Sequence, residues 1–191
     1  GDDTLTIITS DLGNTGSGNI LTDTDTVKIK LDSVNDAPVN TIPQNKIAVD
    51  EDTDLAFTGD KLIKVSDIDV NEGNGDVEVT LTVTKGILTL QNITNLSFDV
   101  NNPNDSATVI NKGLIEDVNT ALKTLVYRGN TNANGVDTQT ITTSDLRNTG
   151  TGGILTDTDR FEITFYPVND DPVIAVPTEQ NVNEDVRLIF S

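Results

Sequence analysis

The sequence predicts an all-β fold, a β-sandwich with one short inserted α-helix, and three observations lead to this prediction. Apolar and polar residues alternate through several short stretches, which is typical of half-buried strands. Clusters of Gly, Asn and Asp separate these stretches at the spacing of a sandwich. One stretch, residues 114–125, instead carries apolar side chains at helical spacing.

The strands are expected where the alternation is clearest. In residues 77–83 Val and Leu alternate with Glu and Thr, and residues 27–31 and 161–165 follow the same pattern. Because successive side chains of a strand point to opposite faces, each segment is predicted to bury one face and expose the other. Gly86 then turns the chain into a further apolar strand at 87–90.

The segment 114–125 is predicted to be an amphipathic helix packed across an open edge or end of the sandwich. Its acidic residues precede its lysine, as the helix dipole favours, and its apolar face is expected to belong to the core. The residues concerned are Leu114, Ile115, Glu116, Asp117, Val118, Leu122, Lys123 and Leu125.

An internal repeat sets the domain organisation. Residues 3–43 match residues 137–177 without a gap, and after a one-residue deletion Glu51-Asp52 matches Glu184-Asp185. Such self-similarity is typical of tandem units joined by short linkers. We expect the C-terminal strands of a preceding repeat at 1–35, a complete repeat at 36–170 and the N-terminal strand of a following repeat at 171–191. The terminal strands, lacking most partners of their own domain, would either fray or pair with a neighbouring molecule.

Composition narrows the chemistry. The chain has no Cys, His, Met or Trp, which excludes disulfides, disfavours zinc and leaves oxygen ligands suited to Ca²⁺ or Mg²⁺. The 31 acidic against 12 basic residues, a net charge of -19, disfavour binding to nucleic acid or anionic membranes. No stretch approaches the ~20 apolar residues of a membrane helix, so direct membrane insertion is not expected. The first residues are not a signal peptide, so an address signal is expected elsewhere in a longer protein.

Acidic residues gather in a pattern that could bind a cation. Asp67 and Asp69 alternate with Ile68, so on extended backbone both carboxylates would point the same way. Two like charges that close repel each other unless a cation lies between them. The Gly-Asn-Gly at 73–75 then allows a tight turn. The alternatives are an Asp-rich turn without a ligand and acidity that serves solubility.

The order of these motifs resembles that of the cadherin repeat. Asn-Asp-x-Pro at 35–38 is followed by Glu-Asp at 51–52, Asp-x-Asp at 67–69, Ser-Asp at 144–145 and Asn-Asp-x-Pro again at 169–172. The resemblance implies a cadherin/immunoglobulin-like sandwich with calcium bound between successive domains. It implies that Asn35, Asp36, Asp67, Asp69 and Asp145 meet at the upper end of the full repeat, and that Glu51, Asn169 and Asp170 meet at the lower end.

A closer resemblance is to the bacterial cadherin-like repeats of very large exported adhesins. The motifs that carry it are Asp-Val-Asn-x-Ala-Leu-x-x-Leu-x-Tyr at 117–127, Asn-x-Asn-Gly-x-Asp-Thr at 132–138 and Leu-Thr-Asp-Thr-Asp at 155–159. The resemblance implies a secreted or cell-surface protein of adhesion or biofilm formation. Its repeats would act as a stalk, with Ca²⁺ stiffening the joints between neighbouring repeats of the same chain.

The chain also departs from the ordinary cadherin pattern. The linker begins with Ser33 or Pro167 where cadherins have Asp, their Leu-Asp-Arg-Glu motif is missing, and the helix at 114–125 is foreign to them. Fewer acidic ligands imply one or two ions at each joint, with modest affinity. The adhesive ligand, homophilic or on a host surface, is not specified by these motifs.

Two other function classes remain to be compared with the stalk. A carbohydrate- or protein-binding module is the alternative, but two Tyr, five Phe and no Trp leave little aromatic surface for stacking on sugar rings. An enzyme is not expected, because the acids occupy positions that recur between repeats. Two minor expectations complete the interpretation. The Gly-Thr-Gly-Gly segment at 150–153 is expected to be a flexible loop, and Asp157 and Asp159 are expected to face solvent.

Overall fold

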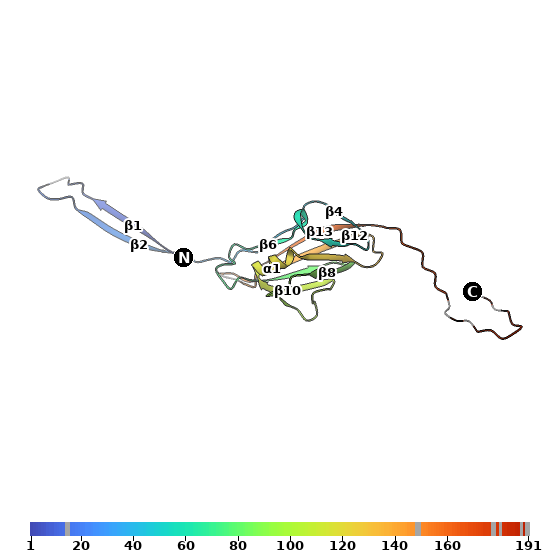
Figure 1. The fold of residues 1–191 in the computed structure, drawn as a ribbon. Coiled ribbons are helices and arrows are strands. Elements are labelled where there is room, and N and C mark those ends of the chain that lie inside the picture. The colour runs from blue at the N-terminus through green and yellow to red at the C-terminus, as the bar shows by residue number, and fades with distance from the viewer. Residues whose placement is uncertain (14–15, 148–149, 177–178, 180, 188, 190–191) are drawn as a thin grey trace.

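The computed structural model describes residues 1–13, 16–147, 150–176, 179, 181–187 and 189. A β-sandwich body occupies the middle of the chain, as Figure 1 shows. A long hairpin projects from one end of this body, and the C-terminal segment leaves from the opposite end (Figure 1). The strands of the hairpin are β1 (Asp2–Ser10) and β2 (Thr22–Lys30).

The body is a sandwich with a six-stranded sheet as one layer, in the order β4-β13-β12-β7-β10-β9. A three-stranded sheet, β5-β11-β8, and a two-stranded sheet, β3-β6, supply the other side of the core. The strands are β3 (Val39–Thr41), β4 (Ile47–Asp50), β5 (Asp54–Ala56), β6 (Lys64–Ser66), β7 (Asp76–Thr82), β8 (Gly86–Leu90), β9 (Ser97–Phe98), β10 (Thr108–Leu114), β11 (Leu125–Gly129), β12 (Gly135–Ser144) and β13 (Thr156–Tyr166). A 3-10 turn, η1 (Gly59–Lys61), precedes β6.

The alternation seen in the sequence places the core as predicted. In β7, Val77, Val79 and Leu81 are buried and the intervening residues are half-buried. Tyr127 of β11 and Phe165 of β13 are also buried, with ring centroids 5.4 Å apart, so residues of both layers meet in one core. The all-β sandwich with one short helix is thereby confirmed.

The helix α1 (Ile115–Leu122) is shorter than the predicted 114–125. Leu114 ends β10 and Leu125 begins β11, so both outer residues of the predicted helix belong to strands. The helix covers the open edge of β6: Asn119 accepts from the N–H of Val65 at 2.9 Å and donates to its carbonyl at 2.8 Å. A side-chain amide thus takes the place of a neighbouring strand.

A buried carboxylate connects two strands of the body with the turn between β7 and β8. Asp137 of β12 accepts hydrogen bonds from the Tyr127 hydroxyl at 2.5 Å, the Thr84 hydroxyl at 2.6 Å and the Lys85 N–H at 2.9 Å. Burial acts to raise its pKa, but the bonds from Thr84 and Tyr127 outweigh burial and hold the pKa below its ordinary value. Burial, and then the hydrogen bond to Asp137 and the charge of that carboxylate, raise the pKa of the Tyr127 hydroxyl.

The hairpin repeats the register of β12 and β13. Asp2 pairs with Lys30 in β1–β2, just as Val136 pairs with Thr164 in β12–β13. Within the body, β12 also pairs with β7, and β13 also pairs with β4. The described residues of 171–191, predicted to be a strand, form none. Their counterpart β4 is held by β13, and a strand needs such a partner to form.

Candidate metal centre

The upper predicted cluster lies at the end of the body that carries the hairpin. Asn35, which is buried, donates from Nδ2 to Asp145 Oδ2 at 2.5 Å and to the carbonyl of Gly153 at 3.1 Å. These bonds join residues that are 110 and 118 positions apart in the sequence. They fix the linker between hairpin and body onto the loop that follows β12.

Asp145 is fully buried and shapes this loop. Its Oδ1 accepts the N–H groups of Arg147 at 2.9 Å and Leu155 at 3.0 Å. Leu146 and Arg147 have φ values of 54° and 64°, in the left-handed region, so the chain reverses sharply beside the carboxylate. One oxygen of Asp145 therefore binds the backbone of its own loop, while the other accepts the hydrogen bond from the Asn35 side chain.

Asp67 and Asp69 lie in a bend after β6, not on the extended backbone that was expected. The difference arises because Asp67 Oδ1 accepts the N–H of Asp69 at 2.8 Å, which closes a local turn. Both acids still belong to one cluster, since Asp69 Oδ2 accepts the N–H of Asp36 at 2.6 Å. Ile68 between them is 79 % exposed, whereas Asp69 is buried.

Buried oxygens without donors mark both predicted sites. Six buried side-chain atoms of the described residues lack a hydrogen-bond partner, and three belong to predicted ligands: Asn35 Oδ1, Asp67 Oδ2 and Glu51 Oε2. A buried acceptor without a partner is unfavourable. All three are carboxylate or amide oxygens, the ligand type that Ca²⁺ prefers. The donor set at each end of the body therefore fits a hard cation.

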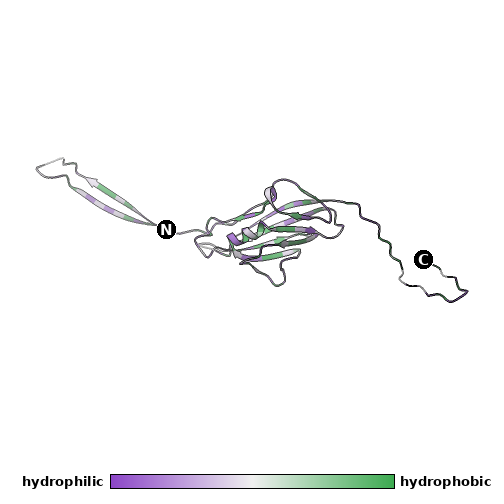
Figure 2. Ribbon diagram, in the orientation of Figure 1, coloured by the Kyte–Doolittle hydropathy of each residue, from purple (hydrophilic) through white to green (hydrophobic). Residues whose placement is uncertain are grey.

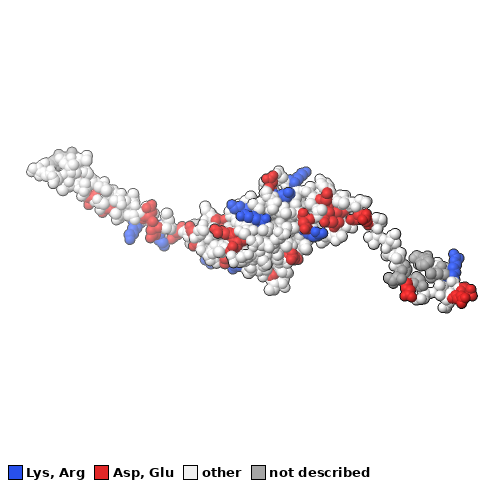
Figure 3. Space-filling view, in the orientation of Figure 1, with Lys and Arg blue, Asp and Glu red and all other residues white. Residues whose placement is uncertain are grey.

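The negative charges of the upper cluster also fit a bound cation. Burial raises the pKa of the Asp67 carboxyl above its ordinary value, and the negative charges of Asp69, Asp145 and Asp36 raise it further, against a lowering by the Asp69 N–H. Figure 3 shows acidic side chains gathered where the hairpin joins the body and where the C-terminal segment leaves it. As the side chains now stand, no three acidic residues in the described part of the chain are arranged to hold an ion.

The lower predicted site is only partly assembled. Glu51 follows β4, is 5 % exposed, and accepts the N–H of Val168 on Oε1 at 2.8 Å. Its own N–H donates to the carbonyl of Tyr166 at 2.9 Å, so Glu51 lies against the start of the second linker. Asn169 and Asp170 are exposed, and the Asn169 amide reaches only the carbonyl of Asp170, at 3.4 Å.

Three features of the upper end escaped the sequence analysis, and the first is a clamp on the linker. Thr151, expected to lie in a flexible loop, donates its N–H to the Ser33 carbonyl at 2.9 Å and accepts the N–H of Asn35 on its carbonyl at 3.3 Å. A Cβ at Gly150 would lie 2.8 Å from Asn35 N and 2.9 Å from Ser33 O, so only glycine allows the approach. The signal that could have found this clamp is the recurrence of the loop glycines at Gly16 and Gly18.

The second is Asp157, which does not simply face solvent. Its Oδ2 accepts the N–H of Asn40 at 2.7 Å, and its carbonyl accepts the Asn40 amide at 3.1 Å. The side-chain oxygen of Asn40, Oδ1, accepts a hydrogen bond from the Thr143 hydroxyl at 2.6 Å. Asp157 thus holds β3 beside β13 and has a structural role in the body.

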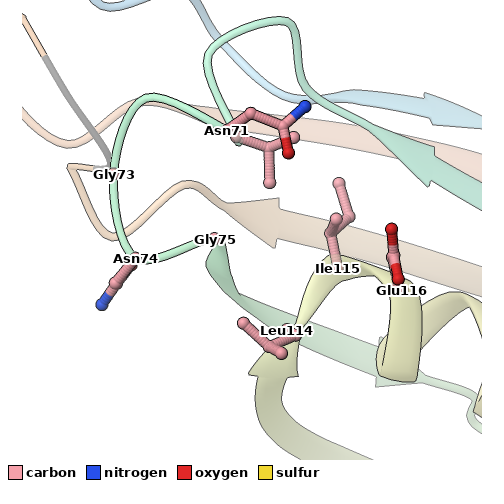
Figure 4. A pocket seen from close by; sticks show the side chains of 8 residues that line it. Asn71, Gly73, Asn74, Gly75, Leu114, Ile115 and Glu116 are labelled. Carbon is pink, nitrogen blue, oxygen red and sulfur yellow. The ribbon is translucent and has the colours of Figure 1, made fainter.

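The third is a hollow beside the acidic bend, of about 370 Å³. Figure 4 shows it between the loop at Asn71 to Gly75 and the start of α1, with Leu114, Ile115 and Glu116 on the far side. Its lining contains no aromatic side chain. Rings for stacking on a sugar are therefore missing from this hollow.

Comparison with known proteins identifies no relative: no protein-family model matches the chain, and no curated protein matches it. No helix within the described ranges is long and apolar enough to span a membrane.

Proposed function

We propose that the chain is a calcium-binding structural repeat of a secreted or cell-surface adhesin, a stalk unit whose joints are stiffened by Ca²⁺. The carrying observation is that Asn35 Oδ1 and Asp67 Oδ2 are buried without donors at the joint between hairpin and body. Around them, Asp36, Asp69 and Asp145 concentrate negative charge on Asp67. The similarity to bacterial cadherin-like repeats, carried by the motifs at 117–127, 132–138 and 155–159, supports the same function.

A cation would act at this joint by removing an electrostatic penalty. Without one, like charges and burial both disfavour the ionised form of Asp67. Asn35 and Asp36 belong to the linker, whereas Asp67 and Asp69 belong to the body. An ion that takes oxygens from both would therefore restrict the angle between the hairpin and the body.

The lower end supports a stalk of several such joints. Glu51 is held by the Val168 N–H, directly before the second Asn-Asp pair, and its Oε2 is buried without a donor. Asn169 and Asp170 correspond to Asn35 and Asp36, and they extend the same kind of joint in the C-terminal direction. Extracellular modules bind Ca²⁺ with a Kd of about 10⁻⁴–10⁻³ M, and a joint with this few acidic ligands belongs in that range.

A calcium titration of the intact chain tests the proposal. Added Ca²⁺ should raise the melting temperature and narrow the range of lengths measured by small-angle X-ray scattering, because the ion restricts the joint. Asp67→Ala with Asp69→Ala should abolish both responses. Val100→Asp, at a residue 89 % exposed and outside both clusters, is the matched control and should keep them. A chain whose melting temperature and length ignore millimolar Ca²⁺ would refute the proposal.

No observation favours a binding module or an enzyme over the stalk. The hollow beside α1 offers Asn71, Asn74 and Glu116 as polar groups but no aromatic surface. The acids at the upper end recur in sequence at the hairpin tip, where Asp11 corresponds to Asp145. Recurrence along a chain is expected for structural joints.

A further inference from the structure

Two strands that lie close to the linkers of the body pair with each other. β4 belongs to the segment that follows the first linker, residues 31–38, and β13 ends where the second linker, residues 167–170, begins. The two strands pair in parallel, starting with Ile47 opposite Ile163. The β4–β13 pair therefore connects the two linkers directly, without passing through the other strands of the body.

Tension on the two linkers would load this pair in shear. Figure 1 shows that the first linker joins the body at one end and that the C-terminal segment leaves at the opposite end. β4 would therefore be pulled from its N-terminal end and β13 from its C-terminal end. Because parallel strands pulled in this way slide along each other, the hydrogen bonds between them carry the load together. Strands pulled apart from one shared end would instead lose their bonds one at a time.

Further hydrogen bonds fasten the same two segments beyond both ends of the pair. After β4, the Glu51 N–H donates to the Tyr166 carbonyl at 2.9 Å, and Glu51 Oε1 accepts the Val168 N–H at 2.8 Å. Before β4, Asp157 Oδ2 accepts the Asn40 N–H at 2.7 Å. The last segment of the body is therefore fastened to the first at points from Asp157 to Val168.

Apolar packing adds to the resistance of the pair. Figure 2 shows hydrophobic residues along the strands of the body. Ile47 of β4 is 2 % exposed, and Ile163 and Phe165 of β13 are buried with it in the core. Sliding of β4 past β13 would draw Ile47 out of this core, and exposing buried apolar surface to water costs free energy. Hydrogen bonds and apolar contacts would thus have to break in the same step.

We propose that the body bears tension along its long axis, and that the β4–β13 pair is the element that resists this tension. The role in a stalk rests on the proposed function, whereas the shear geometry belongs to the fold. An adhesin holds surfaces together, so tension on it passes through every repeat of its stalk. The resistance is kinetic, because forced unfolding is governed by the rate of unfolding and not by the stability at equilibrium.

Single-molecule force spectroscopy of the intact chain tests the proposal through the direction of pulling. The chain has no Cys, so two introduced cysteines define the points of attachment. Asp32→Cys with Val173→Cys loads the pair in shear, at two exposed positions outside the body. Asn45→Cys with Arg160→Cys, both also exposed, pulls the two strands apart from one end. Pulling from one end should lower the force of unfolding at least about twofold, because the bonds then break in turn.

A pair of proline variants tests the hydrogen bonds between the strands. β4 is the outermost strand of its sheet, and successive N–H groups of a strand point to opposite sides. The Val49 N–H therefore faces β13, as the Glu51 N–H does, whereas the Ala48 N–H faces the outer edge. Val49→Pro removes a bond of the pair and should lower the force of unfolding in shear by about half. Ala48→Pro is the matched control and should keep that force, because proline is tolerated where the N–H faces solvent.

All of these measurements are made in chelator, so their outcome does not depend on calcium. A melting temperature that ignores Ca²⁺ would refute the calcium-stiffened joint and leave the shear geometry untouched. Equal forces in the two pulling directions, or equal forces in Val49→Pro and Ala48→Pro, would overturn the role of the β4–β13 pair. The two pulling directions are compared with the paired residues unchanged, so they decide the question if Val49→Pro does not fold.

Discussion

Asn35 donates its side-chain amide to Asp145, 110 residues further along the chain, at 2.5 Å. The corresponding Asn169 has the same sequence neighbours Val and Asp but is exposed. One motif is thus present both docked and undocked in a single molecule. The linker sequence Val-Asn-Asp therefore does not bury its Asn by itself, and the contact with Asp145 of the body is what buries Asn35.

Replacing the two asparagines should have unequal effects. Asn35→Ala leaves a buried oxygen of Asp145 without its donor, so the free energy of unfolding should fall by about 1–3 kcal/mol. Asn169→Ala removes no buried contact and should change it by less than about 0.5 kcal/mol. Urea unfolding followed by circular dichroism measures both. Equal losses would mean that the Asn35–Asp145 bond does not stabilise the body.

The clamp predicts a difference between two glycines that share a left-handed φ. Gly150 and Gly16 have φ values of 82° and 86°, so alanine is strained at either position. Only Gly150→Ala also pushes a methyl group into the linker backbone. Amide hydrogen exchange of Thr151 and Asn35 should therefore accelerate at least tenfold in Gly150→Ala, which corresponds to about 1.4 kcal/mol of lost protection.

Gly16→Ala is the matched control for strain in that experiment. Its loop carries no linker, so the amides of Thr151 and Asn35 should exchange as in the unchanged chain. Unchanged exchange in Gly150→Ala would show that the loop does not clamp the linker.

Asp67→Asn should have opposite effects with and without calcium. Burial and the neighbouring carboxylates raise the pKa of Asp67, so its ionised form destabilises the folded chain at neutral pH. In chelator, Asn should therefore raise the melting temperature by about 1–3 °C, given that ~1 kcal/mol shifts it by about 2–4 °C in a chain of this size. With Ca²⁺ the unchanged chain should be the more stable one.

The pH dependence gives a second readout of the same residue. Because the folded pKa is raised, the ion-free chain gains stability from Asp67 as the pH falls through that pKa toward the ordinary Asp value of about 3.9. Asp67→Asn should lose this gain. A variant that melts lower than the unchanged chain in chelator would contradict the assignment of repulsion to Asp67.

The contribution of Asp137 to stability should change with pH in the opposite direction to that of Asp67. Its folded pKa is held below the ordinary value, so its contribution is present above about pH 3.9 and is lost as the pH falls through the folded pKa. Asp137→Asn should lower the free energy of unfolding at pH 7 by about 2–4 kcal/mol, since it removes a buried charged acceptor. It should also flatten the decline of stability below pH 4.

Tyr127→Phe separates the hydrogen bond to Asp137 from the packing of the aromatic ring. The ring stays in the core, while one hydrogen bond to Asp137 is lost, so the cost should be about 1–2 kcal/mol. Asp99→Asn is the control for Asp137→Asn. Hydrogen bonds from Asn102 and Asn101 lower the pKa of the Asp99 carboxyl as well, but this carboxylate is exposed. If the free energy of unfolding of Asp137→Asn still fell steeply below pH 4, groups other than Asp137 would be responsible for that fall.

The sequence predicted the sandwich and the presence of a helix because alternation and helical spacing are local signals. It predicted the wrong ends for the helix, since Leu114 and Leu125 fit the helical pattern but pair in β10 and β11. Tertiary pairing overrode local spacing at both positions.

The acidic positions could be named from motif order, but their contacts could not. The bend at Asp67 depends on a local hydrogen bond, and the clamp depends on a glycine approaching a linker more than a hundred residues away. The approach of the linker to this glycine leaves no local pattern in the sequence. The repeat itself held the missing information, because its glycines and its Asp recur at the hairpin tip.

A crystal of the intact chain grown with Ca²⁺, measured for anomalous scattering, tests the metal centre most directly. We predict an anomalous peak about 2.3–2.6 Å from both Asn35 Oδ1 and Asp67 Oδ2, the distances at which oxygen binds Ca²⁺. The second site should show Glu51 Oε2 as the first oxygen of an incomplete ligand set. A map without a peak between Asn35 and Asp67, at millimolar Ca²⁺, would contradict a calcium-stiffened joint.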